Sequence, residues 1–147
     1  MLNVSAGRFI WTFFVGYFFC SMLNWGIAEF LLNDWAAPYF EGFVRSGEGA
    51  SAGINIVKMS VGFMIPLFVS AWWFSTIRTP ISWVLRAIYV GSMVSLAAFF
   101  GTYTFISGWG NVNWWPLMVT AVCDMGSIVP GTLLIAWLQT RGTQTSA

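Results

Sequence analysis

Residues 114–139, WWPLMVTAVCDMGSIVPGTLLIAWLQ, decide the fold class of this chain. The stretch is almost entirely apolar, and Asp124 is its one charged residue. A bilayer core about 30 Å thick needs about 20 apolar residues in a helix, so the stretch is long enough to cross it. Tryptophans stand near both of its ends, where their amphipathic rings favour the depth of the lipid headgroups. The stretch therefore predicts a transmembrane helix.

The composition of the whole chain also indicates a membrane protein. Of its 147 residues, 58% are hydrophobic and 7% are charged, whereas a soluble domain carries about 25% charged residues. The formal net charge of +1 is too small for a protein that binds nucleic acid. The composition therefore predicts an all-α integral membrane protein whose partner is the lipid bilayer.

The residues that metal and nucleophile chemistry need are scarce. The sequence has no histidine, which excludes bis-His haem ligation, His-containing zinc sites and Ser-His or Cys-His nucleophile pairs. Cys20 and Cys123 lie too far apart in the sequence for a Cys-x-x-Cys motif, and two thiols alone make a poor metal site. We therefore expect no metal, no cofactor and no enzymatic activity.

Four apolar stretches are long enough to span a bilayer. The uncharged stretch from Ala87 to Cys123 is too long for one span, and the turn-forming residues 107–111 divide it. We expect one membrane domain over residues 1–147, a four-transmembrane-helix bundle with an outer loop at residues 33–53. The expected helices cover residues 9–30, 54–77, 81–106 and 114–139.

Basic residues predict that both termini of this bundle are cytoplasmic. Four of them flank one face of the four-span arrangement and two flank the other: Arg8, Arg78, Arg86 and Arg141 against Arg45 and Lys58. Cytoplasmic flanks of membrane helices carry the excess of Lys and Arg, so the face with four is predicted to be cytoplasmic. We expect the plasma (inner) membrane as the location.

The outer loop contains a candidate amphipathic helix at residues 34–46. At helical spacing its apolar side chains share one side, and Glu41 and Arg45 pair four residues apart on the other. Such a helix is typical of a segment that lies in the plane of the headgroups. The alternative is a lid or a partner-docking element. The Gly- and Ser-rich residues 46–53 that follow predict a flexible linker.

Small and polar residues recur every three or four positions in each expected span. Small residues let helix backbones approach in lipid, and polar residues bond across the seam, so these stripes are predicted to face the bundle interior. Phe18 and Leu96 lie on the opposite sides of their helices and are expected to face lipid. The stripes are Thr12, Gly16, Cys20, Asn24 and Ala28; Lys58, Gly62, Pro66 and Ser70; Ala87, Gly91, Ser95, Ala98 and Thr102; and Thr120, Asp124, Ser127 and Gly131.

Asp124 is the main candidate for a functional residue. It follows Trp114 by about 10 residues, which places it roughly 15 Å below the outer boundary at 1.5 Å per residue. A carboxylate near the bilayer centre costs about 2.5–3.5 kcal/mol. An ionisable residue at this depth therefore indicates a functional site, and the alternative is a structural, hydrogen-bonded aspartic acid.

Lys58, Asn24 and Glu29 complete the candidate polar core. Lys58 begins the second span, from which it reaches either inward to Asp124 or outward to Glu29 and the headgroups. Asn24, on the stripe of the first span, is a candidate neutral bridge. We favour a protonated Asp124 over an ion pair, because the outward route is the easier one for Lys58.

Two functions fit these features. The first is an accessory or assembly subunit of a larger membrane complex, which the lack of a catalytic motif and the many aromatic residues favour. For the protein in general, we expect the partners to be other membrane protein chains or copies of itself. The alternative is a small proton-coupled transporter that works as an oligomer and uses Asp124. An intramembrane enzyme has the least support, since no nucleophile–base pair, metal cluster or phosphate loop is present.

Overall fold

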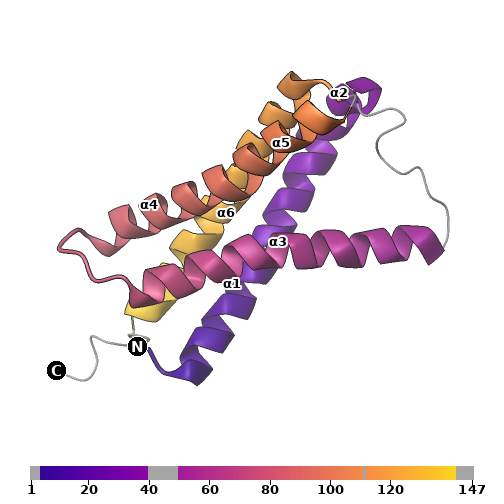
Figure 1. The fold of residues 1–147 in the computed structure, drawn as a ribbon. Helices are drawn as coiled ribbons and strands as arrows, with labels where there is room; N and C mark the ends of the chain where they lie inside the picture. The colour runs from indigo at the N-terminus through magenta and orange to yellow at the C-terminus, as the bar shows by residue number, and fades with distance from the viewer. Residues whose placement is uncertain (1–3, 40–49, 111, 142–147) are drawn as a thin grey trace.

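The computed structural model describes residues 4–39, 50–110 and 112–141, all as helices and short connections. The described residues form four long helical rods, which cross one another (Figure 1). The first consists of α1 (Ala6–Ile27), the π-helical turn η1 (Ala28–Leu32), α2 (Asn33–Ala36) and the short 3-10 helix η2 (Ala37–Tyr39). The second is α3 (Ala50–Thr76). The third consists of α4 (Trp83–Ser95), the π-helical turn η3 (Leu96–Gly101) and α5 (Thr102–Trp109), and the fourth is α6 (Trp114–Thr140).

The four predicted spans are confirmed as helices that are long and apolar enough to cross a membrane. They cover Ala6–Leu32, Val57–Thr76, Trp83–Trp109 and Trp114–Thr140. Most of the predicted interfacial helix, residues 40–46, lies outside the described residues. Its first residues continue the rod of α1 as α2 and η2.

Polar side chains fix where three of the rods begin. The hydroxyl of Ser5 accepts a hydrogen bond from the backbone N–H of Arg8 at the start of α1, and Ser82 does the same before α4. The amide oxygen of Asn113 accepts from the backbone N–H of Trp115 at the start of α6. These caps satisfy backbone donors that have no partner within the helix.

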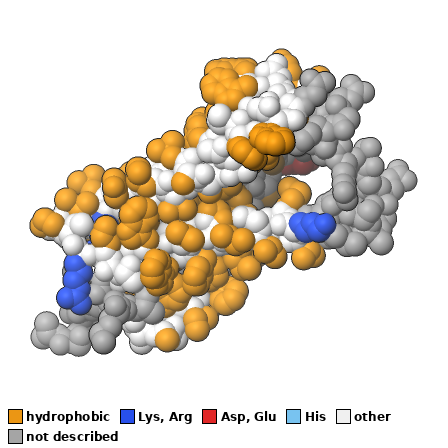
Figure 2. All heavy atoms as spheres, in the orientation of Figure 1, with side chains coloured by type: hydrophobic (Ala, Val, Ile, Leu, Met, Phe, Trp, Pro, Cys, Tyr) orange, Lys and Arg blue, Asp and Glu red, His pale blue; other side chains and the backbone are white. Residues whose placement is uncertain are grey.

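α6 is the central helix of the bundle. It packs against α1, α3, α4 and α5, and its fully buried side chains include Ile128, Thr132 and Ile135. In each of the other three rods, a smaller share of the 18-residue apolar segment is buried. Their outward faces carry large apolar side chains, and Figure 2 shows hydrophobic side chains spread over this surface.

Two pairs of helices approach closely at glycines. A Cβ atom at Gly16 of α1 would collide with Ile135 of α6, and the carbonyl oxygen of Gly131 would lie 3.4 Å from it. A Cβ atom at Gly91 of α4 would lie 3.2 Å from the Cα atom of Val129 on α6. Small residues at these crossings therefore let α1 and α4 pack directly on the backbone of α6.

Most of the predicted interior stripes are confirmed. In the first span Thr12, Gly16 and Cys20 are buried, in the third Ala87, Gly91 and Ser95, and in the fourth Asp124, Ser127 and Gly131. The predicted outward faces are also confirmed, since Phe18 is 67% exposed and Leu96 is 45% exposed.

The predicted interior stripe of the second span is wrong in its N-terminal half. Lys58 and Gly62 are exposed, whereas Pro66 and Ser70 are buried. Figure 1 shows the reason: the N-terminal part of α3 projects away from the other helices, and only its C-terminal part packs against them. Small residues there do not meet a neighbouring backbone, because no atom outside the helix lies within 4 Å of a Cβ atom at Gly62.

A polar network joins three helices at the end of the bundle where the described chain begins and ends. The side-chain amide of Gln139 on α6 donates to the hydroxyl of Thr12 on α1 at 3.3 Å. Its oxygen accepts from the hydroxyl of Ser75 on α3 at 3.0 Å. The guanidinium of Arg8 donates to the carbonyl of Leu138. These bonds hold the start of α1 beside the end of α6.

Candidate functional site

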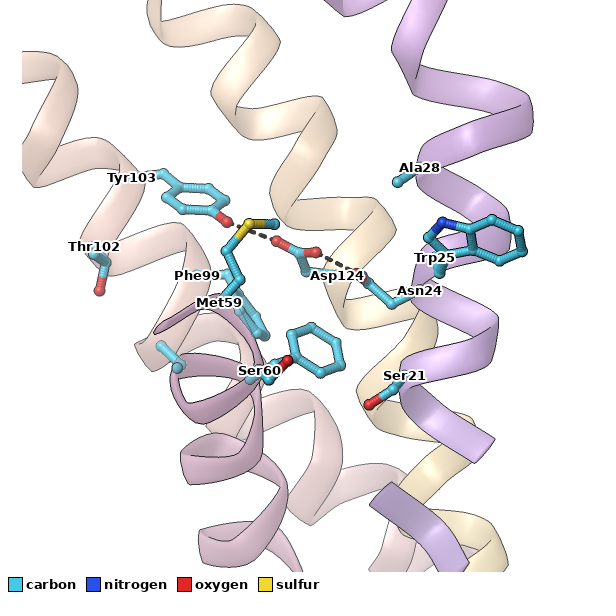
Figure 3. A pocket seen from close by; sticks show the side chains of 13 residues that line it. Ser21, Asn24, Trp25, Ala28, Met59, Ser60, Phe99, Thr102, Tyr103 and Asp124 are labelled. Carbon is cyan, nitrogen blue, oxygen red and sulfur yellow. Dashed lines mark hydrogen bonds between the residues drawn. The ribbon is translucent and has the colours of Figure 1, made fainter. Parts of the chain in front are cut away.

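Three rods bring three polar side chains together in the other half of the bundle. The amide nitrogen of Asn24 on α1 donates to Oδ1 of Asp124 on α6 at 2.8 Å. The hydroxyl of Tyr103 on α5 donates to Oδ2 of the same carboxyl at 2.7 Å. Figure 3 shows the carboxyl between these two donors. The three residues are called the Asp124 triad below.

The triad satisfies the carboxyl with neutral donors. Asp124 is 8% exposed, and burial of a polar group without hydrogen bonds is costly. Each carboxyl oxygen here has one donor, and an ionised carboxylate has about four acceptor positions in all. The triad therefore leaves room for a further partner on the carboxyl.

The triad also accommodates either protonation state of Asp124. The phenolic hydroxyl of Tyr103 both donates and accepts, and the side-chain amide of Asn24 carries both a donor and an acceptor. A rotation of the hydroxyl or of the amide therefore turns a donor toward the ionised carboxylate or an acceptor toward the protonated acid. Both protonation states of Asp124 are therefore compatible with the same helix packing.

Tyr103 is the functional candidate that the sequence analysis missed. The predicted stripe of the third span continues from Ala98 to Thr102, but Thr102 is exposed and Tyr103 points inward instead. The cause is η3, because a π-helical turn contains an extra residue and shifts the inward face by one position. Such turns occur often at functional sites, and here η3 ends directly before the helix that carries Tyr103.

A cavity of about 830 Å³ opens beside the triad. Asn24, Tyr103 and Asp124 all lie on its wall. It lies where the N-terminal part of α3 leaves the bundle, and its other described lining residues are Ser21, Trp25, Ala28, Met59, Ser60, Gly62, Phe63, Ala98, Phe99 and Thr102. The splayed helix that breaks the predicted stripe therefore creates the space that Asp124 faces.

Two of the predicted site residues lie apart from the triad. Lys58 is exposed near the start of the apolar part of α3, and no hydrogen bond or ion pair joins it to Asp124. Glu29 is exposed in η1 and is not among the described residues that line the cavity. Of the four predicted polar-core residues, the structure thus brings Asn24 and Asp124 together.

The cysteines lie near the triad as separate thiols. The Cys20 thiol donates to the carbonyl of Ser127 at 3.1 Å, which ties α1 to α6 one turn below Asn24. Cys123 is partly buried next to Asp124 in α6. Within residues 4–39, 50–110 and 112–141, no group of three or more His, Cys, Asp or Glu side chains is arranged to hold a metal.

Comparisons of this chain with protein-family models, with curated proteins and with solved structures found no match. The geometry is therefore the basis for assigning a class. Four apolar helices, with a carboxyl buried among them beside an open cavity, define a membrane-type helical bundle with a candidate ligand site.

Proposed function

We propose that this protein is a small proton-coupled transporter in which Asp124 binds and releases the proton. The observation that carries the proposal is the position of Asp124 on the wall of an 830 Å³ cavity, between two neutral hydrogen-bonding partners. Ionisable residues within membrane spans typically mark substrate pathways and proton relays. The cavity gives such a residue access to a ligand as well as to protons.

Two features of the helices support movement at the cavity. The π-helical turns η1 and η3 lie in the first and third rods beside it, and Ala28 and Phe99 within them line it. Pro66 interrupts the hydrogen-bond ladder of α3. Irregular turns and prolines are where membrane helices bend most easily, so the cavity is bordered by places where its walls can move.

The transporter proposal includes a membrane orientation. We place both termini in the cytoplasm and the protein in the plasma (inner) membrane, on the basis of the flanking arginines. The cavity then lies in the outer half of the bundle. Residues 34–46 are proposed to lie along the outer headgroups, and the working unit is proposed to be an oligomer.

The orientation predicts which positions react with a membrane-impermeant thiol reagent. Gly7 and Gly108 suit single-cysteine variants, because no atom lies within 4 Å of a Cβ atom built at either position. With Cys20 and Cys123 replaced by Ala, Gly108→Cys should be labelled on intact cells and Gly7→Cys only after permeabilisation. Labelling of both on intact cells would overturn the four-span topology, and the opposite pattern would reverse the orientation.

Proton coupling is testable in liposomes that contain the purified protein and a pH-sensitive dye. Addition of panels of cationic, neutral and anionic compounds should produce proton movement with at least one panel. The same movement should be absent with Asp124→Asn and retained with Phe18→Leu, which alters a lipid-facing side chain. Compound-driven proton movement of equal rate in wild type and Asp124→Asn would refute the proposal, and so would its absence with all panels.

The assembly-subunit function is a second candidate, and one feature favours it. In the first rod only 11% of the 18-residue apolar segment is buried, against 44% in α6. The exposed side chains of the first rod include Trp11, Phe14, Phe18 and Phe30. Such a face suits another membrane helix as well as lipid. Purification in mild detergent at native expression distinguishes the two functions. A stoichiometric larger assembly supports the assembly subunit, and a homo-oligomer supports the transporter.

A further inference from the structure

We infer that the cavity beside Asp124 takes an organic monocation with bulky apolar substituents. The inference rests on the proposed function, in which this cavity is the ligand site, and it names the class of ligand. Three properties of the cavity support it: the charge of its wall, the side chains that surround the carboxyl, and its volume.

The charge of the wall favours a cation. Asp124 is the one Asp or Glu among the described residues that line the cavity, and none of those residues is Lys, Arg or His. A ligand cation would therefore neutralise the buried carboxylate, whereas a ligand anion would be placed against it without a counter-ion. In a poorly solvated site, an uncompensated charge of this kind is strongly unfavourable.

The side chains around the carboxyl suit a cation that is apolar rather than strongly hydrated. Phe63, Phe99 and Tyr103 line the cavity, and the ring of Phe99 lies tilted against the rings of both other residues, at centroid distances of 5.8 and 6.1 Å. Aromatic faces attract cations, and the attraction is strongest for ligands that lose their water easily. Met59 and Trp25 add apolar surface. The hydroxyls of Ser21, Ser60 and Thr102 also line the wall, so the preference for a cation rests on the carboxyl and the aromatic rings and not on a lack of hydrogen-bonding groups.

The volume fits a ligand of moderate size. Cavities that enclose drug-sized ligands range from about 300 to 1,000 Å³, and this one measures about 830 Å³. A bare metal ion would leave most of that space unfilled and would find one carboxyl and no further charged ligand among the described lining residues. Size and charge together therefore indicate an organic cation.

The same carboxyl would then bind either the cation or a proton. Both ligands neutralise Asp124, and each excludes the other if the cation sits against its free acceptor positions. The other titratable groups near Asp124 are Tyr103 on α5, Cys20 on α1 and Cys123 on α6. Lys58 on α3 and Glu29 in η1 are exposed, and neither lines the described part of the cavity. This exclusion is how proton movement becomes coupled to the ligand.

The test is equilibrium binding of two ions of equal shape and opposite charge to the protein in nanodiscs. Tetraphenylphosphonium is the cation and tetraphenylborate the anion, with empty nanodiscs subtracted. Wild type should bind the cation saturably and should not bind the anion. As pH falls through the range in which the carboxyl takes up a proton, the cation affinity should fall about tenfold per pH unit.

Three variants assign the effect to the carboxyl. Asp124→Asn should lower the cation affinity at least tenfold and remove its pH dependence. Phe18→Leu, on the lipid-facing side of α1, should change neither. Lys58→Met should leave the affinity unchanged or raise it, because it removes a positive charge from the outer part of α3. The charge preference and the pH dependence of wild type test the inference even if Asp124→Asn does not fold.

The outcomes separate this inference from the proposed function. Equal binding of both ions, preference for the anion, or wild-type cation affinity in Asp124→Asn would overturn the cation site. If the liposome assay still shows Asp124-dependent proton movement with neutral or anionic compounds, the transporter function stands and only the ligand class is wrong. If the cation binds as expected but no compound moves protons, the cation site stands and the transporter function is wrong.

Discussion

Replacing Gly16 by leucine is expected to lower the free energy of unfolding by about 3 kcal/mol or more, at the upper end of overpacking effects. Even a Cβ atom at this position collides with Ile135, a side chain that is fully buried in α6. The carbonyl oxygen of Gly131 lies behind it, so the larger side chain forces α1 away from the central helix. Thermal unfolding in detergent should show a large drop in midpoint or loss of the folded bundle.

The same substitution at Gly26 is the matched control. Gly26 lies in the same helix, and no atom outside α1 lies within 4 Å of a Cβ atom there. Gly26→Leu should be neutral or should stabilise by up to about 1 kcal/mol, because glycine is a poor helix former. If Gly16→Leu and Gly26→Leu have the same effect, α1 does not pack on α6 as described.

Replacing Asp124 by asparagine is expected to abolish proton-coupled transport while the bundle still folds. Asparagine keeps an oxygen that accepts from Asn24 or Tyr103 and an amide that donates to the other, so the loss of stability should be about 0.5–1.5 kcal/mol. Asparagine cannot gain or lose a proton at neutral pH. Thermal unfolding should therefore stay close to wild type, and proton movement in liposomes should be lost.

Two further variants make this expectation specific. Asp124→Leu has a similar volume but leaves the amide of Asn24 and the hydroxyl of Tyr103 without their partner, so it should destabilise more, by about 1–3 kcal/mol per stranded group. The double variant Asp124→Asn with Lys58→Met should be no more stable than Asp124→Asn alone. If Asp124→Asn instead lowers the free energy of unfolding by about 3–5 kcal/mol and the added Lys58→Met restores that stability, the carboxyl is paired with Lys58. The hydrogen bonds described for the Asp124 triad would then be wrong.

The sequence predicted the four helices because length and apolar composition alone decide whether a helix can span a bilayer. It also predicted that Asn24 and Asp124 face the interior, because each belongs to a stripe with three- or four-residue spacing in a regular helix. Their direct contact is set by the crossing of α1 and α6, where Gly16 and Gly131 bring the backbones together. Helical spacing predicts which side of a helix faces inward. It does not predict the depth at which the inward faces of two helices meet.

Tyr103 and the cavity were not predictable in the same way. A π-helical turn moves the inward face by one residue, and no residue type in η3 distinguishes that turn from an α-helix. The N-terminal half of α3 has the small residues of a packed face, yet its first part projects away from the other helices. The sequence of α3 shows where small side chains allow close packing. Whether that packing occurs depends on the positions of the neighbouring rods.

Asp124 is proposed to exchange a proton while it faces the cavity, and infrared difference spectroscopy of the protein in nanodiscs tests this proposal most directly. Stepping the pH should make the stretching band of a protonated carboxyl appear on acidification and vanish on alkalisation. Tyr103→Phe should shift the band by removing one hydrogen bond, and tetraphenylphosphonium should diminish it. The band should be absent from Asp124→Asn. A carboxyl band that does not change with pH while the bundle stays folded, or one that is unaltered in Asp124→Asn, would contradict the account.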